Sequence, residues 1–353
     1  MANVTYLIGA GASAGKYSDN GHKDEGLPIV SEIQDSILGI ILFIQKTEIP
    51  ITLNLRKPQL GLNSVDDWKK MREILLARFE DLHAKCRENA TIDTYAKKLI
   101  LKGEIGSFKN LEQMLTLFFI WEQLIERPDS RYDTFLANIL GRNLRFPDYI
   151  RVISWNYDSQ FEIAYHEYNP NNTLSVGSKR TNHKIPHDIT KINGTATFTN
   201  QDYFPKFRKD FQAEIDATEG DDLYNSAQVK DQKKLIKLIC LYKSYIVDSE
   251  DNTDLSFAFD ETSTPSQAIL DSINEIIKKT DVLVIIGYTF PFFNRQIDRQ
   301  ILENLKPNAK IYIQDKYPKS VRQSLEAVLT DVQRQVQIVE IERTEQFYLP
   351  PEL

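Results

Sequence analysis

The chain has 353 residues, of which 41% are hydrophobic and 26% are charged, and its formal net charge at pH 7 is -7. This length suits two or three domains, or one α/β domain with insertions, and it allows a substantial core. The acidic balance argues against a surface made for nucleic acid, so we expect no direct sequence-specific nucleic-acid binding. The two cysteines, Cys86 and Cys240, are too few for a disulfide framework or a four-cysteine zinc site. We therefore expect a cytoplasmic protein without a structural metal.

The first residues show neither the basic region nor the cleavage pattern of a signal peptide, so we expect the first strand of the fold there. The longest apolar run, residues 37–44, is far shorter than the ~20 residues that span a bilayer. It is typical of a buried helix, and we expect no membrane segment.

A strand followed at once by a glycine-rich turn opens the chain. The apolar run 4–8 is typical of a buried parallel strand, and Gly9 and Gly11 follow it directly. This spacing fits the turn of a dinucleotide site, in which backbone N–H groups and a helix N-terminus point at an anion. The turn is not a P-loop, because Lys16 is followed by Tyr17. Similar turns occur in α/β proteins that bind no nucleotide, so the remaining motifs must decide.

Helical patterns dominate the next part of the chain. Isoleucines at helical spacing predict a helix over about residues 29–44, which we expect to cover one face of the sheet. Strand signals then disappear, which favours an inserted helical subdomain over residues 41–145. Within it we expect helices at 65–86, 92–101, 111–125 and 132–140.

An amide and a carboxylate follow the next predicted strand. Residues 149–154 have the apolar pattern of a strand and run into Asn156 and Asp158. Open α/β sheets bind ligands at the carboxyl edge of their strands, so both side chains are candidates for a binding or catalytic role. Helix capping is the simpler alternative, since either side chain suits the start of the helix that follows.

A second strand end of this kind begins at residue 189 and runs into Asn193 and Gly194. A hairpin turn is the alternative explanation of this asparagine and glycine pair. We expect His183 and His187, in the preceding polar loop, to be solvated rather than catalytic. Residues 201–253 are polar and charged, with one helix over 232–245, and are interpreted as a second insertion or a cover.

The last third of the chain alternates strands with helices. Strands are predicted at 255–259, 282–286, 310–313 and 336–341, and helices at 266–279, 295–305 and 320–329. The strand 282–286 ends in Gly287 and Thr289, and the strand 310–313 ends in Gln314 and Asp315. Short connections between alternating elements predict an α/β fold with a doubly wound, mostly parallel, Rossmann-like sheet.

Four of these stretches carry a resemblance to a known family. In chain order they are Gly-Ala-Gly-Ala-Ser at 9–13, Trp-Asn-Tyr-Asp at 155–158, Lys-Ile-Asn-Gly-Thr at 191–195 and Gly-Tyr-Thr-Phe-Pro-Phe-Phe-Asn at 287–294. Together they resemble the sirtuin-like NAD-binding domain, and most of all its bacterial branch that hydrolyses NAD in anti-phage defence. They cover about a tenth of the chain. The zinc module of the family is missing, because four cysteines are lacking, and a helical insertion stands in its place.

The resemblance implies a role for each matching residue. The pyrophosphate would lie on Gly9, Ala10, Gly11 and Ser13, and the nicotinamide ribose beside Asn156 and Asp158. Three residues of the fourth stretch would face the adenosine half, with Gln314 or Asp315 as a further candidate. These three are Gly287, Thr289 and Asn294.

Asn193 stands where the family has a histidine that acts as a base or orients the ribose and the water. An asparagine cannot take up a proton at neutral pH, although its amide can hold a hydroxyl group or a water. Three accounts stay open. The protein is an active enzyme with a weaker or relocated base, a natural pseudoenzyme that binds NAD, or a chain deliberately inactivated by substitution.

The resemblance implies an NAD+ glycohydrolase that cleaves the nicotinamide–ribose bond and needs no metal. Asn156, Asp158 and Asn193 would be catalytic, with Asp158 stabilising positive charge at the anomeric carbon and Asn156 positioning the water. Such an enzyme would deplete NAD in bacterial anti-phage defence, and it would need a partner protein or oligomerisation as a trigger. The alternative is a non-catalytic sensor or assembly subunit that binds NAD or ADP-ribose, with residues 41–145 as a protein interface.

The resemblance also implies a division of the chain into three parts. Residues 1–40, 146–200 and 254–345 would form the sirtuin-like Rossmann domain. Residues 41–145 would form the helical subdomain, and residues 201–253 the polar insertion.

Overall fold

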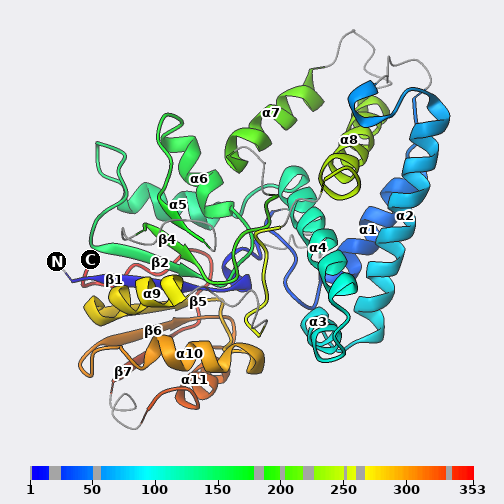
Figure 1. The fold of residues 1–353 in the computed structure, drawn as a ribbon. Coiled ribbons are helices and arrows are strands. Elements are labelled where there is room, and N and C mark those ends of the chain that lie inside the picture. Colours follow the sequence, from blue (N-terminus) through cyan, green and yellow to red (C-terminus); the bar gives the residue numbers. More distant parts are fainter. Residues whose placement is uncertain are drawn as a thin grey trace. The chain divides into compact units, whose positions relative to one another are not determined.

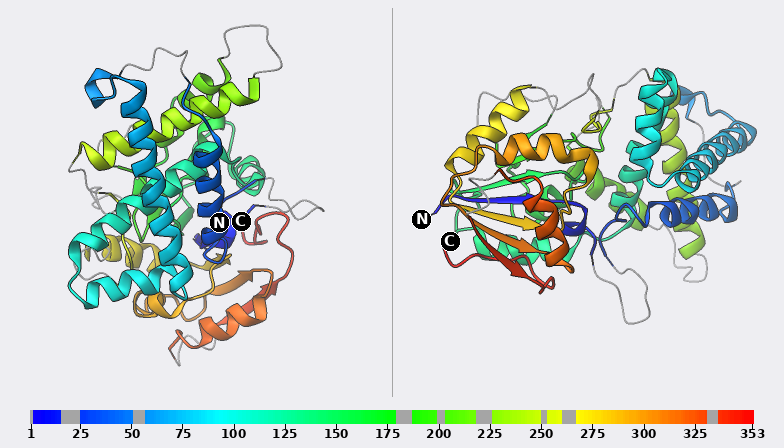
Figure 2. Two further views of the ribbon diagram at one scale, coloured as in Figure 1. Left: turned by 90° about the vertical axis from the view of Figure 1, so that its right-hand side faces the viewer. Right: turned by 90° about the horizontal axis from the view of Figure 1, so that it is seen from below.

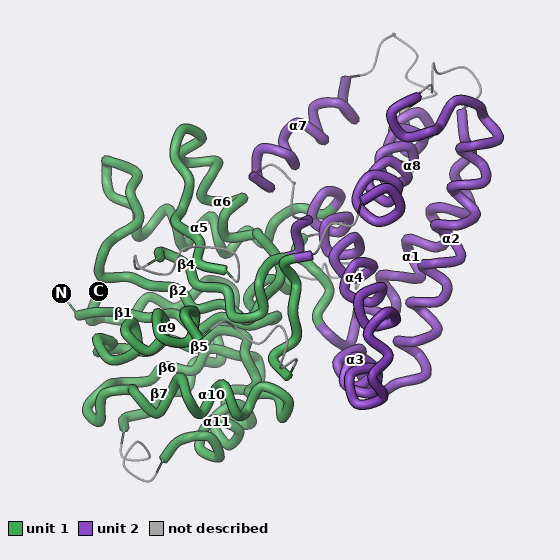
Figure 3. Tube along the Cα trace, viewed as in Figure 1, with its two compact units in different colours: residues 1–29, 126–195, 254–353 green, residues 30–125, 196–253 purple. Residues whose placement is uncertain are grey.

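The structure is a computed structural model of the chain. It describes residues 2–15, 25–50, 57–178, 187–198, 203–217, 226–249, 253–259, 267–330 and 336–353. These residues divide into two compact units, which Figure 3 shows in different colours. Unit 1 comprises residues 1–29, 126–195 and 254–353, and unit 2 comprises residues 30–125 and 196–253.

Unit 1 is built on a seven-stranded sheet in which every neighbouring pair of strands is parallel. The strand order is β3-β4-β2-β1-β5-β6-β7. The strands are β1 (Val4–Ile8), β2 (Ile150–Ser154), β3 (Val176–Gly177), β4 (Ile189–Lys191), β5 (Val282–Ile286), β6 (Lys310–Gln314) and β7 (Gln337–Ile341). All five residues of β1 and of β5 are buried, which explains why these strands are apolar throughout instead of alternating.

Helices cover both faces of this sheet (Figures 1 and 2). Side chains of a strand alternate between the faces, so Leu7 points into one core and Tyr6 and Ile8 into the other. The core with Leu7 is closed by α9 (Gln267–Lys279), α10 (Arg295–Leu302) and α11 (Pro318–Glu326). The opposite core is closed by α5 (Ser130–Ile139) and α6 (Gln160–Tyr168).

The strand order places a topological switch point beside β1. From β1 the chain adds β2 and β4 on one side of the sheet, and it returns to add β5, β6 and β7 on the other side. Ligands of open α/β sheets bind where the order reverses in this way, at the carboxyl ends of the strands. The predicted α/β fold with a doubly wound, mostly parallel sheet is thus confirmed. The loops after β1, β2 and β5 lie at the switch point and are the candidates for a ligand site.

Unit 2 is helical. It contains α1 (Ile33–Lys46), α2 (Val65–Glu88), α3 (Ile92–Leu101), α4 (Ile105–Ile125), α7 (Phe204–Asp216) and α8 (Ser226–Tyr242), which continues into a π-helical turn at Lys243–Val247. The helix α4 is buried almost all round and packs against α2, α3, α7 and α8. Arg208 of α7 donates to the carbonyl of Gln123 at 2.8 Å, and Trp121 packs edge-on against Phe211. No helix in the described part of the chain has the length and apolar content needed to cross a membrane.

The units divide the chain differently from the sequence-based expectation. The helix expected to cover the sheet, α1, belongs to unit 2 and packs against α2. The helix α5, expected in the insertion, belongs to unit 1, because Phe135 and Leu136 join the core on β1 and β2. The described residues of 201–253 share unit 2 with 30–125 instead of forming a separate cover.

The prediction of a strand over residues 255–259 is wrong. These residues form no strand, although residues 255–258 are buried. Ser256 donates its backbone N–H to the carbonyl of Asn193 at 2.9 Å. The apolar side chains of this stretch therefore fill the core beside a loop and do not extend the sheet.

Candidate functional site

The register of the sheet brings the predicted motifs to one edge. Ile8 is paired with Ser154 and with Ile286, and the pairing continues to Lys191 on β4 and Gln314 on β6. The next residues along the chain therefore leave the sheet at the same level. Each of the four sequence stretches of the family resemblance begins at the last residue of a strand or at the residue that follows it.

The turn after β1 packs tightly against the loop after β5. The N–H of Gly9 donates to the carbonyl of Ile286, and the N–H of Gly11 donates to the carbonyl of Gly287, both at 3.0 Å. A Cβ on Gly9 would lie 2.7 Å from the Gly287 oxygen, and one on Gly11 would lie 2.8 Å from the Gly287 Cα. The glycines are thus required by contact between two loops, whereas the sequence analysis had attributed them to the approach of phosphates. Ala10, at the tip of the turn, is exposed.

Asn156 joins this turn directly. Its side-chain Nδ2 donates to the carbonyl of Gly9 at 2.9 Å and to Oγ of Ser13 at 3.1 Å. Ser13 is buried, and its hydroxyl also shares a 2.9 Å hydrogen bond with the hydroxyl of Tyr132. The structure therefore brings together two residues that the sequence analysis placed on different parts of the ligand. Both protons of the Asn156 amide are used within the protein, in bonds to the turn after β1.

Asp158 lies one residue before Ser159, the N-cap of α6, and makes a local hydrogen bond there. Its Oδ1 accepts the backbone N–H of Gln160, in the first turn of α6, at 3.0 Å. Gln160 in turn donates its side-chain Nε2 to the carbonyl of Ser13 at 3.1 Å. The bond to Gln160 uses one of the two carboxylate oxygens of Asp158, and Gln160 connects this start of α6 to the glycine turn.

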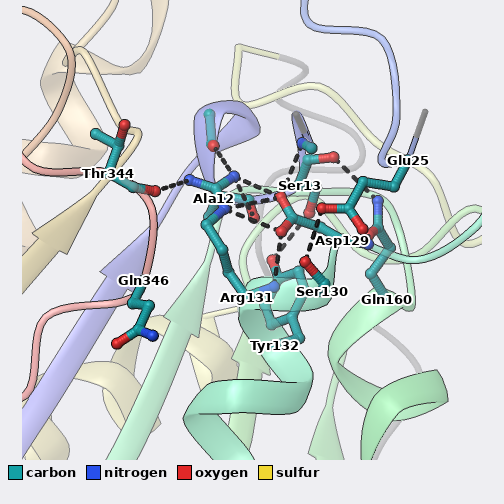
Figure 4. A network of polar contacts seen from close by, with 12 residues as sticks. Ala12, Ser13, Glu25, Asp129, Ser130, Arg131, Tyr132, Gln160, Thr344 and Gln346 are labelled. Atoms are coloured by element: carbon teal, nitrogen blue, oxygen red, sulfur yellow. Dashed lines mark hydrogen bonds and ion pairs between the residues drawn. The ribbon is translucent and has the colours of Figure 1, made fainter. Parts of the chain in front are cut away.

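Asp129 and Arg131 support the turn from α5, and the sequence analysis missed both (Figure 4). Arg131 donates to the carbonyl of Gly11 at 2.9 Å and forms a buried ion pair with Asp129 at 2.5 Å. Asp129 also accepts the N–H of Gly15 at 2.8 Å. Asp129 and Arg131 sit in the only part of the predicted helical insertion that belongs to unit 1, so their spacing along the sequence gave no sign of this role.

Asn193 lies two residues after β4 and has an unsatisfied side-chain oxygen. It is 7% exposed, and its Oδ1 accepts no hydrogen bond from the described residues. The following Gly194 has φ +71°, and the Thr195 hydroxyl donates to Asp254 at 2.9 Å. The two strands that pair with β4 are β2 and β3, and both run parallel to it. A hairpin turn would need an antiparallel partner, so that alternative is wrong. Asp254, which holds this loop, was not identified from the sequence.

The residues expected on the adenosine side differ in their solvent exposure and in their hydrogen bonds within the protein. Thr289 is exposed and Gly287 is half-buried. Asn294 donates its Nδ2 to the Tyr288 hydroxyl at 3.1 Å. Half-buried Asp315 accepts the N–H of Tyr317 at 2.8 Å.

Gln314, the alternative to Asp315, has no group left for a ligand. Its Nε2 donates to the carbonyls of Arg343 and Gln346, both at 2.6 Å. Its Oε1 accepts the N–H of Tyr348 at 2.9 Å. Its side chain therefore fastens the C-terminal segment.

A buried carboxyl group links the β2 and β5 loops. The Tyr288 hydroxyl lies 2.9 and 2.8 Å from the two oxygens of Asp298, and the Tyr288 ring stacks on Trp155 with centroids 5.5 Å apart. Burial raises the pKa of Asp298 to about 8, against the opposing effect of hydrogen bonds from Tyr288 and Trp155. Asp298 was missed, although it lies on the apolar side of α10 with Ile301, where a charged residue is unusual.

Substitution of Gly287 by Ala should unfold unit 1 at lower denaturant. Gly287 has φ +58°, and an added Cβ would lie 2.4 Å from the carbonyl carbon of Gly11. Strain and overlap together should lower the free energy of unfolding by about 3 kcal/mol. Gly141→Ala is the matched control, since its Cβ would meet only a side-chain atom at 3.5 Å. Equal urea midpoints for the two variants would contradict the tight packing of these loops.

Asp298→Asn should change how stability depends on pH. Because the pKa of Asp298 rises from 3.8 to about 8 on folding, its contribution to stability is complete below about pH 4 and is lost as the pH rises to about 8. The asparagine variant lacks this loss. The difference in unfolding free energy, variant minus wild type, should therefore grow with pH by up to about 1.4 kcal/mol per unit. Urea unfolding at several pH values measures it, and Asp148→Asn, at an exposed position, should show no such trend.

His183 lies outside the described residues. His187 is buried before β4 and its Nδ1 shares a 2.8 Å hydrogen bond with the Ser175 hydroxyl, so the expectation that it is solvated is wrong. Within the described ranges, no three His, Cys, Asp or Glu side chains gather closely enough to hold a metal ion. A comparison with protein-family models finds no match for the chain, and a search of curated proteins finds none either.

Proposed function

We propose that this chain is a sirtuin-like NAD+ glycohydrolase, which binds NAD and cleaves its nicotinamide–ribose bond. The observation that carries the proposal is the contact of Asn156, at the end of β2, with Gly9 and Ser13 of the turn after β1. It joins the expected catalytic amide to the expected phosphate turn at the switch point of a parallel sheet. The products would be nicotinamide, ADP-ribose and one proton.

The binding step would use the accessible parts of the strand ends. The exposed Ala10 and half-buried Gly11 offer the pyrophosphate a backbone surface. The exposed Thr289 lies after the neighbouring strand β5, on the side proposed for the adenosine half. The N–H groups of Gly9 and Gly11 are already used within the protein, so side chains and the remaining backbone must supply most donors to the phosphates.

The cleavage step would rely on electrostatics more than on a base. Departure of nicotinamide leaves positive charge at the anomeric carbon, which the Asp158 carboxylate would stabilise. The unsatisfied Oδ1 of Asn193 would accept a hydrogen bond from a ribose hydroxyl or from the attacking water. The water must lose a proton in this reaction, and Asp158 is the carboxylate at hand to receive it. Nicotinamide leaves readily from a pyridinium, so the site does not require a strong acid.

Asn193 also favours a second candidate, a sensor or assembly subunit that binds NAD or ADP-ribose without cleaving it. Its amide satisfies a ligand hydroxyl but cannot take up a proton. In either case we propose that a partner protein or self-association controls the protein, as suits an NAD-depleting effector of bacterial anti-phage defence. An enzyme that cleaves NAD without control would drain the cell of its cofactor.

Asn156→Ala tests the main proposal. The wild-type protein should release nicotinamide from NAD. The variant should lose about 10²-fold or more of this rate, because it removes the amide and with it the hydrogen bonds that join the end of β2 to the turn. Nicotinamide is measured by chromatography over a range of protein concentrations. Asn138→Ala serves as control and should keep the wild-type rate, because Asn138 is exposed on α5 and donates to the Thr134 carbonyl of the same helix. Wild-type protein that binds NAD by calorimetry but never cleaves it would leave the binding function alone.

Asn193→His tests the role of the strand end after β4. An imidazole at this position would have a pKa near ~6.5 and could accept the proton of the attacking water. Nicotinamide release should rise about tenfold or more, while the dissociation constant for NAD changes little. Introducing Asn156→Ala into this variant should remove the gain. An unchanged rate in Asn193→His would show that residue 193 does not face the reacting ribose.

A further inference from the structure

A lysine is buried beneath the candidate site. Lys191, the last residue of β4, is 2% exposed. Its ammonium group lies 2.8 Å from Oε1 of Glu162, whose side chain is also buried. It donates a second hydrogen bond to the backbone carbonyl of Asp158. A lysine on a strand end and a glutamate on α6 thus meet under a backbone group of the ligand-facing loop.

The register explains how Lys191 reaches this position. Lys191 is paired with Ser154, which is paired with Ile8, so these three side chains point to the same face of the sheet. Asn193 follows Lys191 by two residues, beyond the end of the ladder. Ile8, Ser154, Asp158, Glu162 and Lys191 line one small pocket. The ammonium group of Lys191 therefore reaches the Asp158 loop from within this pocket.

Stability alone gives little reason for such an ion pair. Removing two charges from water costs free energy, and apolar residues of similar size in the same place are often equally stable or more stable. What apolar residues cannot do is donate a hydrogen bond to the Asp158 carbonyl. The ion pair is therefore better explained by its hydrogen bond to the Asp158 carbonyl than by a contribution to stability.

The charges of the pair also suit the proposed reaction. Lys191 and Glu162 cancel each other, so the three charged groups together leave one negative charge, that of the Asp158 carboxylate. A pyridinium substrate and an oxocarbenium-like transition state are both positively charged. An unbalanced lysine at this place would weaken the attraction of Asp158 for them, and Glu162 prevents this.

We propose that Lys191 and Glu162 form a positioning pair for cleavage of the nicotinamide–ribose bond. Lys191 holds the Asp158 backbone in place from the protein interior, and Glu162 fixes Lys191 and neutralises it. The Asp158 carboxylate is thereby kept in the orientation that serves the transition state. This inference rests on the proposed function, but it concerns residues outside the four stretches that suggested that function.

The test compares two double variants of the full chain. Lys191→Met with Glu162→Leu removes the charges and the donor while keeping the side-chain volume. Lys191→Gln with Glu162→Gln removes the charges but keeps an amide able to donate to the Asp158 carbonyl. We expect kcat for NAD to fall about 10²-fold in the first and about tenfold in the second. KM should change less than threefold, and the urea midpoint of the Met/Leu variant should be at least that of the wild type.

A pair at the other end of the sheet gives the control. Lys310 and Glu352 lie 3.1 Å apart at the amino end of β6, and Lys310→Met with Glu352→Leu should leave kcat unchanged. Folded Met/Leu and Gln/Gln variants that both keep the wild-type kcat would overturn the positioning role alone. A loss confined to KM would also overturn it, because the pair would then affect binding and not the cleavage step. Wild-type protein that neither binds nor cleaves NAD would overturn the proposed function, and this inference with it.

Discussion

The close contact between the turn after β1 and the loop after β5 is the constraint on which the rest of unit 1 depends. The Cα atoms of Gly9, Gly11 and Gly287 lie where side chains would overlap with the opposite backbone. Hydrogen bonds from the N–H groups of Gly9 and Gly11 join the two segments. This contact sets the level at which the strands stop and the direction in which the following loops leave the sheet. The positions of Ser13 and Tyr288, and through them of Asn156 and Asp298, follow from it.

Side chains from distant parts of the chain also form hydrogen bonds with the turn after β1. Arg131 holds its carbonyl groups, Asn156 holds Gly9 and Ser13, and Gln160 holds the Ser13 backbone. These contacts are made between groups of the protein itself, and they restrict the conformational freedom of the turn. A site that is arranged in advance stabilises a transition state better than one that must rearrange during the reaction.

The sequence was most informative where a pattern has one physical cause. The apolar runs of β1, β2 and β5 could be identified because both faces of these strands are buried, and strand ends necessarily gather at one edge of a parallel sheet. Asp129, Arg131 and Asp254 could not be identified, because each binds the candidate site through a partner far away in the sequence. Asp298 could not be identified, because its sequence position does not show that its carboxyl group is buried against Tyr288. The glycines of the first turn were located correctly but explained by a ligand, since a single chain does not reveal which backbone approaches them. The helix α1 was assigned to the sheet because helical periodicity shows that a face is buried but not against what.

The C-terminal segment illustrates how far the site extends through the chain. Gln314 binds three backbone groups between residues 343 and 348, and Arg131 connects the carbonyl of Thr344 to that of Gly11. The guanidinium group of Arg131 therefore joins the segment after β7 to the turn that is proposed to hold the pyrophosphate. Proteolytic removal of this tail would free the Arg131 side chain on one side without touching any residue proposed to meet a ligand. The integrity of residues 343–348 is thus a property of the site itself, and an intact mass is part of any meaningful measurement of its activity.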